Sequence, residues 1–382
     1  MRAKASGAPG SFHVRPLPFA LLALLAGAGA LAGASERPDA KMEWIGVSKD
    51  EKGFVGAASG RRFVPWGFNY DRDYRKRLLE EYWDRDWATV AEDFREMKAL
   101  GATVVRIHLQ FGRFMDAPDK PNSHSLHQLG RLLRLAETTG LHLDLTGLGC
   151  YRKRAVPSWY DALGDPERWA AQARFWEAVA RRCAHSPAVF CYDLMNEPVV
   201  SGGRRRAGDW LAGELDGFSY VQFISSAPTS GPRVEVAQQW IATLTRAIRR
   251  NDSRHLITVG LLPNSQASDA LNSGFFPGEI APDLDFISVH LYPRSGKLAE
   301  DLKLLDGFRV GKPVVIEEIF PLACSAAELR AFIQQARAKA AGFLGFYWGQ
   351  TPDQLRASAT PGAVLTRQWL EIFQELDPEK TR

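Results

Sequence analysis

The stretch Ala188–Pro198, AVFCYDLMNEP, decides how the rest of the sequence is interpreted. Its first half is an apolar run of strand length, rich in Val, Phe, Cys and Tyr, and a polar cluster closed by a proline ends it. This pattern predicts a buried strand that carries the carboxylate of Glu197 at its exit. In parallel α/β barrels the active site is built where the strands end, so Glu197 is the first candidate for chemistry.

The same unit, a short β-rich run followed by an amphipathic helical pattern, repeats from Phe63 to the end of the chain. We expect strands at residues 63–70, 103–111, 141–149, 188–196, 255–260, 285–293, 312–320 and 342–350. Eight such units predict the α/β class and a closed (β/α)8 TIM barrel in preference to an open doubly wound sheet. The sequence has no GxGxxG motif after a strand and no GxxxxGK[ST] motif, which counts against nucleotide-binding folds.

The helices between these strands are expected from apolar residues at helical spacing. The clearest helix runs from about Trp87 and places Trp87, Val90, Phe94 and Met97 on one face. The helix after the third strand is expected to open at Asp165-Pro166, with a capping residue followed by proline at the first helical position.

The first 34 residues differ in composition from the rest of the chain and look like a secretory signal. Three basic residues precede an apolar run from Phe19 to Leu31, and Ala32-Gly33-Ala34 fits a small-residue cleavage site. We predict cleavage after Ala34, a secreted or periplasmic mature protein, and no stable membrane insertion once the signal is removed. Residues 35–62 are expected to form a short N-terminal β extension that closes the bottom of the barrel, and residues 63–382 to form the catalytic barrel.

Composition and charge are ordinary for a large globular enzyme. Of the 382 residues, 45% are hydrophobic and 24% are charged. The predicted signal contains three basic residues and no acidic residue, so its removal lowers the formal net charge from +4 to +1. A nearly neutral protein lacks the strongly basic surface that binds phosphate backbones, and no nucleic-acid partner is expected.

The cysteines and histidines do not form a recognisable metal or redox motif. The four cysteines are Cys150, Cys183, Cys191 and Cys324, and no two have CxxC spacing. Cys183 and Cys191 lie across an expected helix-to-strand turn, so a disulfide between them and two buried free thiols both stay open. The histidines are scattered and include no HExxH pair, so no metal is predicted.

A second acidic group is expected where the seventh strand ends, at Glu317-Glu318. Carboxylates from the fourth and seventh strands would face each other across the barrel mouth. Glycoside hydrolysis uses such a pair, in which one carboxyl protonates the leaving oxygen and the other attacks the anomeric carbon or activates water. Neighbouring residues of a strand point to opposite faces, so only one of Glu317 and Glu318 is expected to face the mouth.

The sequence resembles glycoside hydrolase family 5, the cellulase and mannanase group of retaining (β/α)8 hydrolases, over nearly the whole mature chain. Asn196-Glu197-Pro198 at the fourth strand is the strongest motif, and the resemblance implies that Glu197 is the acid/base. The seventh-strand IEEIF resembles the family's I-G-E-F, which implies that Glu318 is the nucleophile and that Glu317 replaces the glycine.

The resemblance also implies roles for side chains around the two glutamates. Arg106 resembles the second-strand arginine that hydrogen-bonds the nucleophile, here Glu318, and Asn196 resembles the residue that holds the sugar 2-hydroxyl. His290 and Tyr292 are two residues apart, hence on one strand face, and look like the sixth-strand pair that lines the catalytic subsite.

Three positions bear on how the sugar is held. Trp348 resembles the eighth-strand aromatic platform under the sugar ring. Trp159, which follows the third strand, is a further candidate for substrate binding, with packing as its alternative role. The family often ends the third strand in a histidine, where this chain has Thr146.

Each of these residues also has a purely structural explanation. A buried glutamate can pair with an arginine without taking part in catalysis. A single strand histidine is more often hydrogen-bonded in a core, and His108 is expected to be such a residue. The combination of these residues at strand exits, in the expected order, favours catalysis.

We therefore predict a secreted, monomeric, retaining glycoside hydrolase that cleaves β-linked glucan or mannan poly- or oligosaccharides through a covalent glycosyl-enzyme, without a cofactor. A transglycosylase with the same catalytic pair and a non-catalytic carbohydrate-binding barrel are the alternatives. The sequence leaves open which β-glycan is used and whether cleavage occurs within chains or at their ends.

Overall fold

A computed structural model describes residues 42–206, 208–226, 232–266, 272–346 and 348–380 of the chain. Of the two units Met1–Lys41 and Met42–Arg382, only the second contains described residues. The predicted signal segment and its cleavage site after Ala34 lie outside the described residues.

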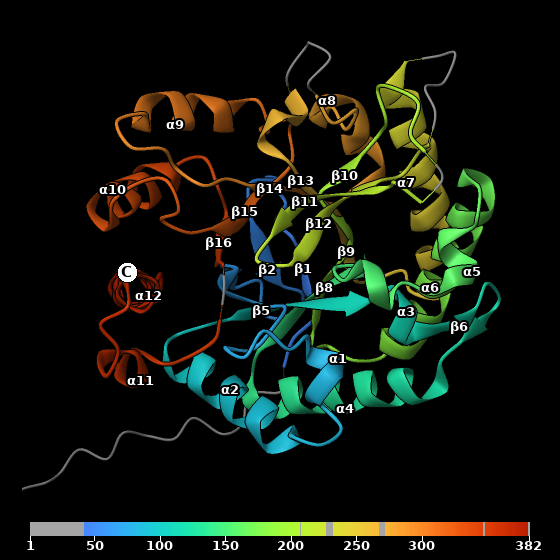
Figure 1. Cartoon of the computed structure of the whole chain (residues 1–382). Helices are drawn as coiled ribbons and strands as arrows, with labels where there is room; N and C mark the ends of the chain where they lie inside the picture. Colours follow the sequence, from blue (N-terminus) through green and yellow to red (C-terminus); the bar gives the residue numbers. More distant parts are fainter. Residues whose placement is uncertain (1–41, 207, 227–231, 267–271, 347, 381–382) are drawn as a thin grey trace, which may run out of the picture. The chain divides into compact units, whose positions relative to one another are not determined.

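Eight parallel strands form a closed barrel at the centre of the second unit (Figure 1). In chain order they are β4 (Trp66–Tyr70), β5 (Val104–Gln110), β8 (His142–Gly149), β9 (Val189–Asn196), β13 (Leu256–Leu261), β14 (Ile287–His290), β15 (Val314–Ile319) and β16 (Gly342–Gly345). Each strand pairs with the next one along the chain, and β16 pairs with β4 to close the ring. The predicted (β/α)8 TIM barrel is confirmed.

Helices alternate with these strands and surround the barrel (Figure 1). The longer ones are α2 (Trp87–Ala99), α4 (Ser123–Thr139), α6 (Asp165–Cys183), α7 (Arg233–Arg249), α9 (Leu298–Asp306), α10 (Ala326–Ala336) and α12 (Pro361–Glu375). The short ones are α1 (Leu79–Tyr82), α3 (Phe111–Phe114), α5 (Ser158–Asp161), α8 (Pro277–Ile280), α11 (Pro352–Arg356), η1 (Lys153–Ala155), η2 (Pro263–Gln266) and η3 (Ala281–Asp283). Between β13 and β14 the described residues form only short helices.

Local sequence explains where several helices begin and end. The side chain of Asn122 accepts the N–H of Ser125 at the start of α4, and Gly140 ends that helix with a φ of 71°. Helix α6 has the expected proline in its first turn, but Gly164 is its N-cap and not Asp165. The Asp165 carboxylate is occupied elsewhere, because it accepts the backbone N–H and the hydroxyl of Ser226.

A three-stranded antiparallel sheet lies at the end of the barrel where the strands begin. Its strands are β1 (Ile45–Val47), β2 (Phe54–Gly56) and β3 (Arg62–Phe63). The Phe54 ring lies 5.0 Å from the Phe190 ring and 5.2 Å from the Phe286 ring, near the first residues of β9 and β14. These contacts bury apolar surface at the bottom of the barrel.

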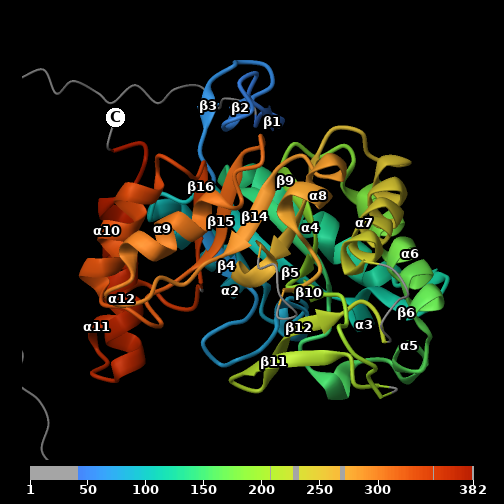
Figure 2. The ribbon, with the colours of Figure 1, turned by 90° about the horizontal axis from the view of Figure 1, so that it is seen from above.

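A second small sheet lies at the opposite end of the barrel (Figure 2). It consists of β10 (Pro198–Val199), β11 (Leu211–Leu215) and β12 (Phe218–Phe223), in the order β10-β12-β11. It belongs to the long connection between β9 and α7, so the exit of β9 carries both Glu197 and an insertion that faces the reader in Figure 1. A third pair, β6 (Met115–Ala117) and β7 (Lys120–Pro121), forms a hairpin before α4.

All four cysteines are free thiols, and Cys150, Cys183 and Cys191 are buried. Of the two possibilities left open by the sequence, the structure therefore has unbridged Cys183 and Cys191. None of the helices in the described residues is both long and apolar enough to span a bilayer.

Candidate active site

The guanidinium of Arg106, on β5, lies at the centre of a buried polar cluster at the strand exits. Its Nη1 donates to Oε1 of Glu318 at 2.7 Å and to Oδ1 of Asn69 at 2.8 Å. Its Nη2 donates to Oδ2 of Asp193 at 2.7 Å and to Oδ1 of Asn196 at 3.0 Å. Arg106 is fully buried, and a charge so far from water is stable only with such partners.

Glu197 and Glu318 face each other as the two strand-exit carboxylates. Three atoms lie within 4.8 Å of one another, namely one carboxylate oxygen of each glutamate and a ring nitrogen of His290. Glu318 is buried at the end of β15, and the side chain of Glu197 is 14% exposed. The structure thus brings together two acidic groups that lie more than a hundred residues apart in the chain.

Glu318 is held in place from two sides. The hydroxyl of Tyr292 donates to Oε2 of Glu318 at 2.6 Å, while Arg106 bonds the other oxygen. Burial, and then the nearby charge of Glu318, raise the pKa of Tyr292 well above its usual value. The phenol therefore remains a hydrogen-bond donor, and Glu318 keeps two donors on its carboxylate.

Glu197 has an unusual backbone conformation immediately after β9. Its φ is 48°, in the left-handed region that a residue with a side chain rarely adopts. Its N–H donates to the carbonyl of Gly260 at 3.0 Å, and its carbonyl accepts the N–H of Gln222 at 3.3 Å. These bonds to β13 and β12 hold the peptide in a conformation that costs free energy.

His290, at the end of β14, links the two carboxylates. Its Nδ1 lies 2.9 Å from Oε1 of Glu197 and 3.5 Å from Oε2 of Glu318. Burial by itself would lower the pKa of His290, but the charge of Glu318 and hydrogen bonds to Glu197 and Glu317 raise it to about 10. The ring therefore carries a positive charge at neutral pH, and both of its nitrogens are donors.

The alternation of side chains expected at Glu317 and Glu318 is broken, because the side chains of both turn toward Arg106 inside the barrel. Val289 pairs with Ile316 and His290 pairs with Glu318, so Glu317 is an extra residue in β15. Such a bulge breaks the alternation of side chains along a strand. Both glutamates consequently reach Arg106, Glu318 at 2.7 Å and Glu317 at 3.6 Å.

Glu317 lies below the carboxylate pair, inside the barrel, among further polar side chains. Its Oε1 accepts the hydroxyl of Ser288 at 3.0 Å. Although burial opposes its ionisation, Arg106 and His290 lower the pKa of Glu317 to about 2. Burial and the charge of Glu317 raise the pKa of Asp144 well above its usual value. Arg106 and His290 thus favour the charged form of Glu317, and burial beside that charge favours the neutral form of Asp144.

The charges around these acids bear on whether they could bind a metal ion. Among the described residues, one group of possible ligands comprises Glu197, His290 and Glu318, and another comprises Asp144, Cys191 and Glu317. The first group includes the protonated ring of His290, and Arg106 lies 3.6 Å from Glu317 of the second. These positive charges already neutralise the carboxylates, so neither group favours a cation.

Sequence reasoning missed Asn69 as a site residue and treated His108 as a hydrogen-bonded core histidine. Nδ2 of Asn69 donates to the carbonyl of Glu317 at 2.9 Å, and its Oδ1 lies 3.1 Å from Nε2 of His108. Nδ1 of His108 lies 2.5 Å from the hydroxyl of Tyr151, and burial lowers the pKa of His108 well below its usual value. Asn69 is the penultimate residue of β4, the first barrel strand, and that position near a strand exit was the available signal.

The two predicted tryptophans do not lie with the carboxylates. Trp348 is fully buried, its indole N–H donates to Asp93 of α2 at 3.0 Å, and its ring packs on Phe68. It has no face open to a sugar, which corrects the prediction that Trp348 is the platform. Trp159 is half-buried in α5 and packs against Phe111, 5.8 Å away between ring centres.

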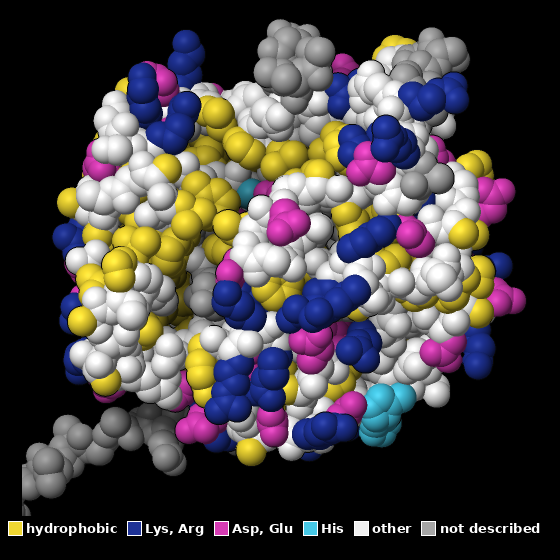
Figure 3. Space-filling view, in the orientation of Figure 1, with side chains coloured by type: hydrophobic (Ala, Val, Ile, Leu, Met, Phe, Trp, Pro, Cys, Tyr) yellow, Lys and Arg dark blue, Asp and Glu magenta, His cyan; other side chains and the backbone are white. Residues whose placement is uncertain are grey.

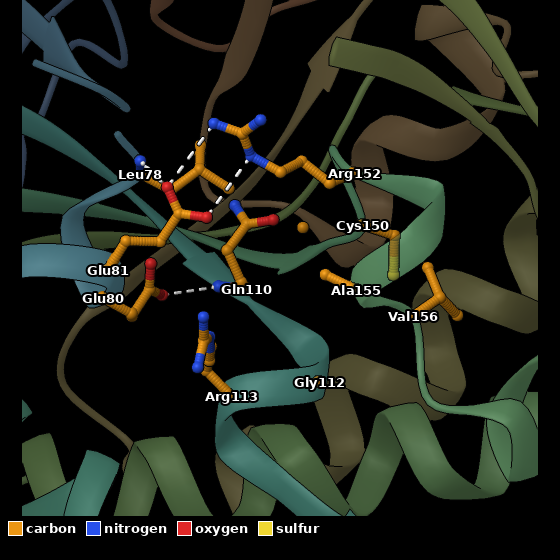
Figure 4. Close-up of a pocket in the computed structure, with 11 residues that line it drawn as sticks. Leu78, Glu80, Glu81, Gln110, Gly112, Arg113, Cys150, Arg152, Ala155 and Val156 are labelled. Atoms are coloured by element: carbon orange, nitrogen blue, oxygen red, sulfur yellow. Dashed lines mark hydrogen bonds and ion pairs between the residues drawn. The ribbon is translucent and has the colours of Figure 1, made fainter. Parts of the chain in front are cut away.

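The strand-exit face is hollowed beside the insertion that carries β11 and β12. Figure 3 shows hydrophobic side chains gathered in this hollow, between the region of α10 and α12 and the centre of the face. A separate narrow pocket lies beside the exits of β5 and β8 (Figure 4). There, Glu80 accepts the backbone N–H of Gln110 at 2.7 Å, and burial raises the pKa of Glu80 to about 7.

Comparison with solved structures shows the same fold in other proteins. The exo-beta-1,4-mannosidase of Opitutaceae bacterium strain TAV5 matches with a TM-score of 0.65 and 20% identity, over 88% of this chain and 62% of that protein. The endo-1,4-beta-mannanase of Rhizomucor miehei matches with a TM-score of 0.61 and 19% identity, over 89% of this chain and all of that protein.

Comparison of sequences is consistent with the fold. Mannan endo-1,4-beta-mannosidase A of Aspergillus aculeatus is 25% identical over 213 residues, which are 48% of this chain and 48% of that protein. The match thus spans about half the length of this curated relative. The model of the family described as Cellulase (glycosyl hydrolase family 5) matches residues 67–337, from the second residue of β4 to just beyond α10. With most of its barrel and more than half of its length matched, the chain belongs to glycosyl hydrolase family 5.

Proposed function

We propose that this chain is a retaining glycoside hydrolase that cleaves β-linked mannan- or glucan-type chains by double displacement. The observation that carries the proposal is the closeness of Glu197 and Glu318, whose carboxylate oxygens lie within 4.8 Å. Retaining glycosidases hold their two carboxyl groups about 5 to 5.5 Å apart, and inverting ones about 6.5 to 9.5 Å. A pair this close leaves no room for a water molecule between Glu318 and the anomeric carbon, which inversion would need.

The first step forms a covalent glycosyl-enzyme. A carboxylate oxygen of Glu318 attacks the anomeric carbon as the bond from that carbon to the leaving oxygen breaks, and Glu197 gives its proton to the leaving oxygen. Arg106 and Tyr292 hold Glu318 by 2.7 Å and 2.6 Å hydrogen bonds, which aim the attacking carboxylate.

In the second step Glu197 takes a proton from water, the water oxygen attacks the anomeric carbon, and the bond to Glu318 breaks. The charged ring of His290, 2.9 Å from Glu197, donates to the carboxylate that the first step leaves behind. Two inversions at one carbon give a product with the configuration of the substrate.

Asn196 is suited to hold the sugar beside these groups. Its Oδ1 accepts from Arg106 at 3.0 Å, and one hydrogen of its amide goes to the carbonyl of Tyr220 at 3.2 Å. The amide has a second hydrogen, which is available to a sugar 2-hydroxyl. Hydrogen bonds to the 2-hydroxyl strengthen in the transition state of glycoside hydrolysis.

The substrate proposal puts mannan first. The curated relative from Aspergillus aculeatus is described as a mannan endo-1,4-beta-mannosidase. Glucan stays as the second candidate because the family is described as cellulase. Export is also part of the proposal, because the basic and apolar pattern of residues 2–34 is that of a secretory signal.

The experiment is reducing-sugar release by the protein from β-mannans and β-glucans, with Glu318→Ala and Glu197→Gln compared in parallel. We expect release from one polymer class and a loss of at least about 10³-fold in each variant. Glu371→Gln, in an exposed pair with Arg367 on α12, is the matched control and should behave like the wild type. Activity that survives in both active-site variants would refute the assigned pair.

Two further measurements separate the roles of the carboxylates. Proton NMR of the first product should show the β-anomer, whereas an initial α-anomer would mean inversion. With an aryl glycoside, Glu197→Ala should be rescued by azide and give the β-glycosyl azide, because azide needs no general base. A β-glycosyl azide from Glu318→Ala would instead mean that Glu318 is the acid/base and Glu197 the nucleophile.

A further inference from the structure

The positions of the two carboxylates define how a substrate chain crosses the barrel mouth. Glu318 attacks the sugar called the glycone, and Glu197 protonates the oxygen that joins it to the leaving sugar. In a 1,4-linked chain, C4 lies across the ring from C1, so further glycone sugars would extend away from Glu197. In the ring of eight strands, β16 stands opposite β9, and β4 is next to β16. A longer glycone would therefore leave past the exits of β16 and β4.

On that side of the mouth, side chains from two segments are hydrogen-bonded to one another. Nη1 of Arg72 donates to the hydroxyl of Tyr220 at 2.5 Å and lies 2.8 Å from Oδ2 of Asp71. The Tyr220 hydroxyl donates in turn to Asp71 at 3.1 Å. Asp71 and Arg72 follow β4, and Tyr220 belongs to β12. We call Asp71, Arg72 and Tyr220 the end wall.

The end wall is packed and shielded from water. Asp71 is fully buried, Arg72 is 4% exposed and Tyr220 is 6% exposed. The guanidinium of Arg72 lies over the rings of Phe218 and Phe346, at 5.3 Å and 5.4 Å from their centres. Separating a buried, hydrogen-bonded ion pair is costly, so a sugar chain cannot simply push the wall aside.

The hairpin that supplies Tyr220 is anchored along its length. The N–H of Ser219 donates to the carbonyl of Tyr151 at 2.8 Å, and the amide of Gln222 donates to the carbonyl of Leu148 at 2.8 Å. At its tip, Asp216 forms an ion pair with Lys76 at 2.5 Å. The hairpin thus extends from the exit of β9 past β8 to the loop after β4, in front of the barrel strands in Figure 1.

The end wall is linked through one aromatic ring to the tyrosine that bonds the nucleophile. The ring of Phe346, which follows β16, is 6.2 Å from the Tyr220 ring and 6.3 Å from the ring of Tyr292, whose hydroxyl bonds Glu318. Oδ1 of Asp71 is buried and has no hydrogen-bond partner in the described part of the chain. A buried acceptor without a donor is costly, and a sugar hydroxyl would supply the donor.

We propose that the glycone site holds a single sugar, and that the enzyme removes one sugar at a time from the non-reducing end of its substrate. Asp71 accepts a hydroxyl of that terminal sugar, and Arg72 and Tyr220 close the site behind it. This inference rests on the proposed function, since it concerns the same two carboxylates.

The test follows the products from a β-mannan pentasaccharide and its β-glucan counterpart at early times. We expect the monosaccharide and the tetrasaccharide alone. A pentasaccharide reduced at its reducing end should be cleaved as fast as the parent, and one whose terminal 4-hydroxyl is methylated should be cleaved at least tenfold more slowly. Early di- and trisaccharides, or normal cleavage of the methylated compound, would overturn the inference and leave the proposed function intact. Absence of any cleavage would overturn both.

Variants test the end wall itself. Asp71→Asn and Tyr220→Phe keep the size of the side chains, and each should lower kcat/KM for the pentasaccharide by about tenfold to a hundredfold, as loss of hydrogen bonds to a charged group does. Tyr220→Ala should open the wall and release disaccharide. Asp216→Asn, in the exposed ion pair of the same hairpin, is the control and should leave rate and products unchanged. Wild-type rates and products in all three wall variants, with unchanged circular dichroism, would overturn the assignment.

Discussion

Nε2 of His290 lies 3.5 Å from Oε2 of Glu317, on the side of the ring that faces into the barrel. The other ring nitrogen faces Glu197 at 2.9 Å. The imidazole of His290 thus lies between Glu197, which we propose protonates the substrate, and Glu317, which has no such role. Because Glu317 is the extra residue of a bulge in β15, this arrangement depends on one local irregularity in an otherwise regular strand.

We predict that Glu317→Gln lowers the pKa of His290 from its value of about 10, because the variant removes one of the carboxylates that stabilise the charged ring. NMR of ¹⁵N-labelled imidazole groups would follow the titration directly. Glu371→Gln provides the matched control for a distant carboxylate. An unchanged His290 titration in Glu317→Gln would show that Glu317 does not set the charge of this ring.

The same pKa makes a prediction about stability. His290 titrates higher in the folded protein than in the unfolded chain, where its pKa is about 6.5. Its contribution to stability is therefore fully present below about pH 6.5 and is lost as the pH rises through about 10. In Glu317→Gln this loss should occur at lower pH. Urea unfolding between pH 6 and pH 10 measures the effect, and identical pH profiles would contradict it.

We predict that Asp144→Asn raises the free energy of unfolding at pH 7 by at least about 1 kcal/mol. Burial and Glu317 raise the pKa of Asp144, so the folded protein binds a proton that the unfolded chain has already released at pH 7. Stability of the wild type should therefore fall as the pH rises above about 3.9. Asparagine has the shape of a neutral aspartic acid and a hydrogen-bond donor, but it does not need to bind a proton to be uncharged. If Asp144→Asn is less stable than the wild type at pH 7, Asp144 is not neutral in the fold.

We predict that Glu197→Gly is more stable than Glu197→Ala by about 1 kcal/mol. Both variants remove the carboxylate, but only glycine adopts a φ of 48° without steric cost. Thermal unfolding of the pair isolates the backbone contribution from that of the charge. Equal stabilities would mean that the conformation after β9 is not strained.

We predict that Trp348→Phe costs about 1 to 3 kcal/mol of stability and changes kcat/KM by less than about threefold. The indole is buried and donates to Asp93, so its loss leaves a carboxylate without one donor. Kinetics on the same substrate, beside urea unfolding, separate the two effects. A large fall in kcat/KM with normal stability would instead place the ring against the sugar.

The barrel could be predicted from sequence because its strands are short apolar runs with turn residues at their ends. The positions of Arg106, Glu197, His290 and Glu318 followed from the same pattern, since strand exits meet at one rim. Their hydrogen bonds in the structure agree with the expected grouping.

What could not be predicted depends on contacts between distant segments. The register between β14 and β15 turns Glu317 inward, and no single strand contains that information. Likewise, the capping residue of α6 differs from the prediction because Ser226, in another loop, takes the carboxylate of Asp165. The contact of Arg72 with Tyr220 joins positions 148 residues apart, beyond any local pattern.

The backbone of β12 is bonded directly to the two residues at the exit of β9. The carbonyl of Tyr220 accepts the amide of Asn196, and the N–H of Gln222 donates to the carbonyl of Glu197. A chain that displaced Tyr220 would thereby pull on the acid and on the group beside it. A substrate that fits badly would then bind less tightly and would also react more slowly. Affinity and the rate of cleavage would therefore rise or fall together.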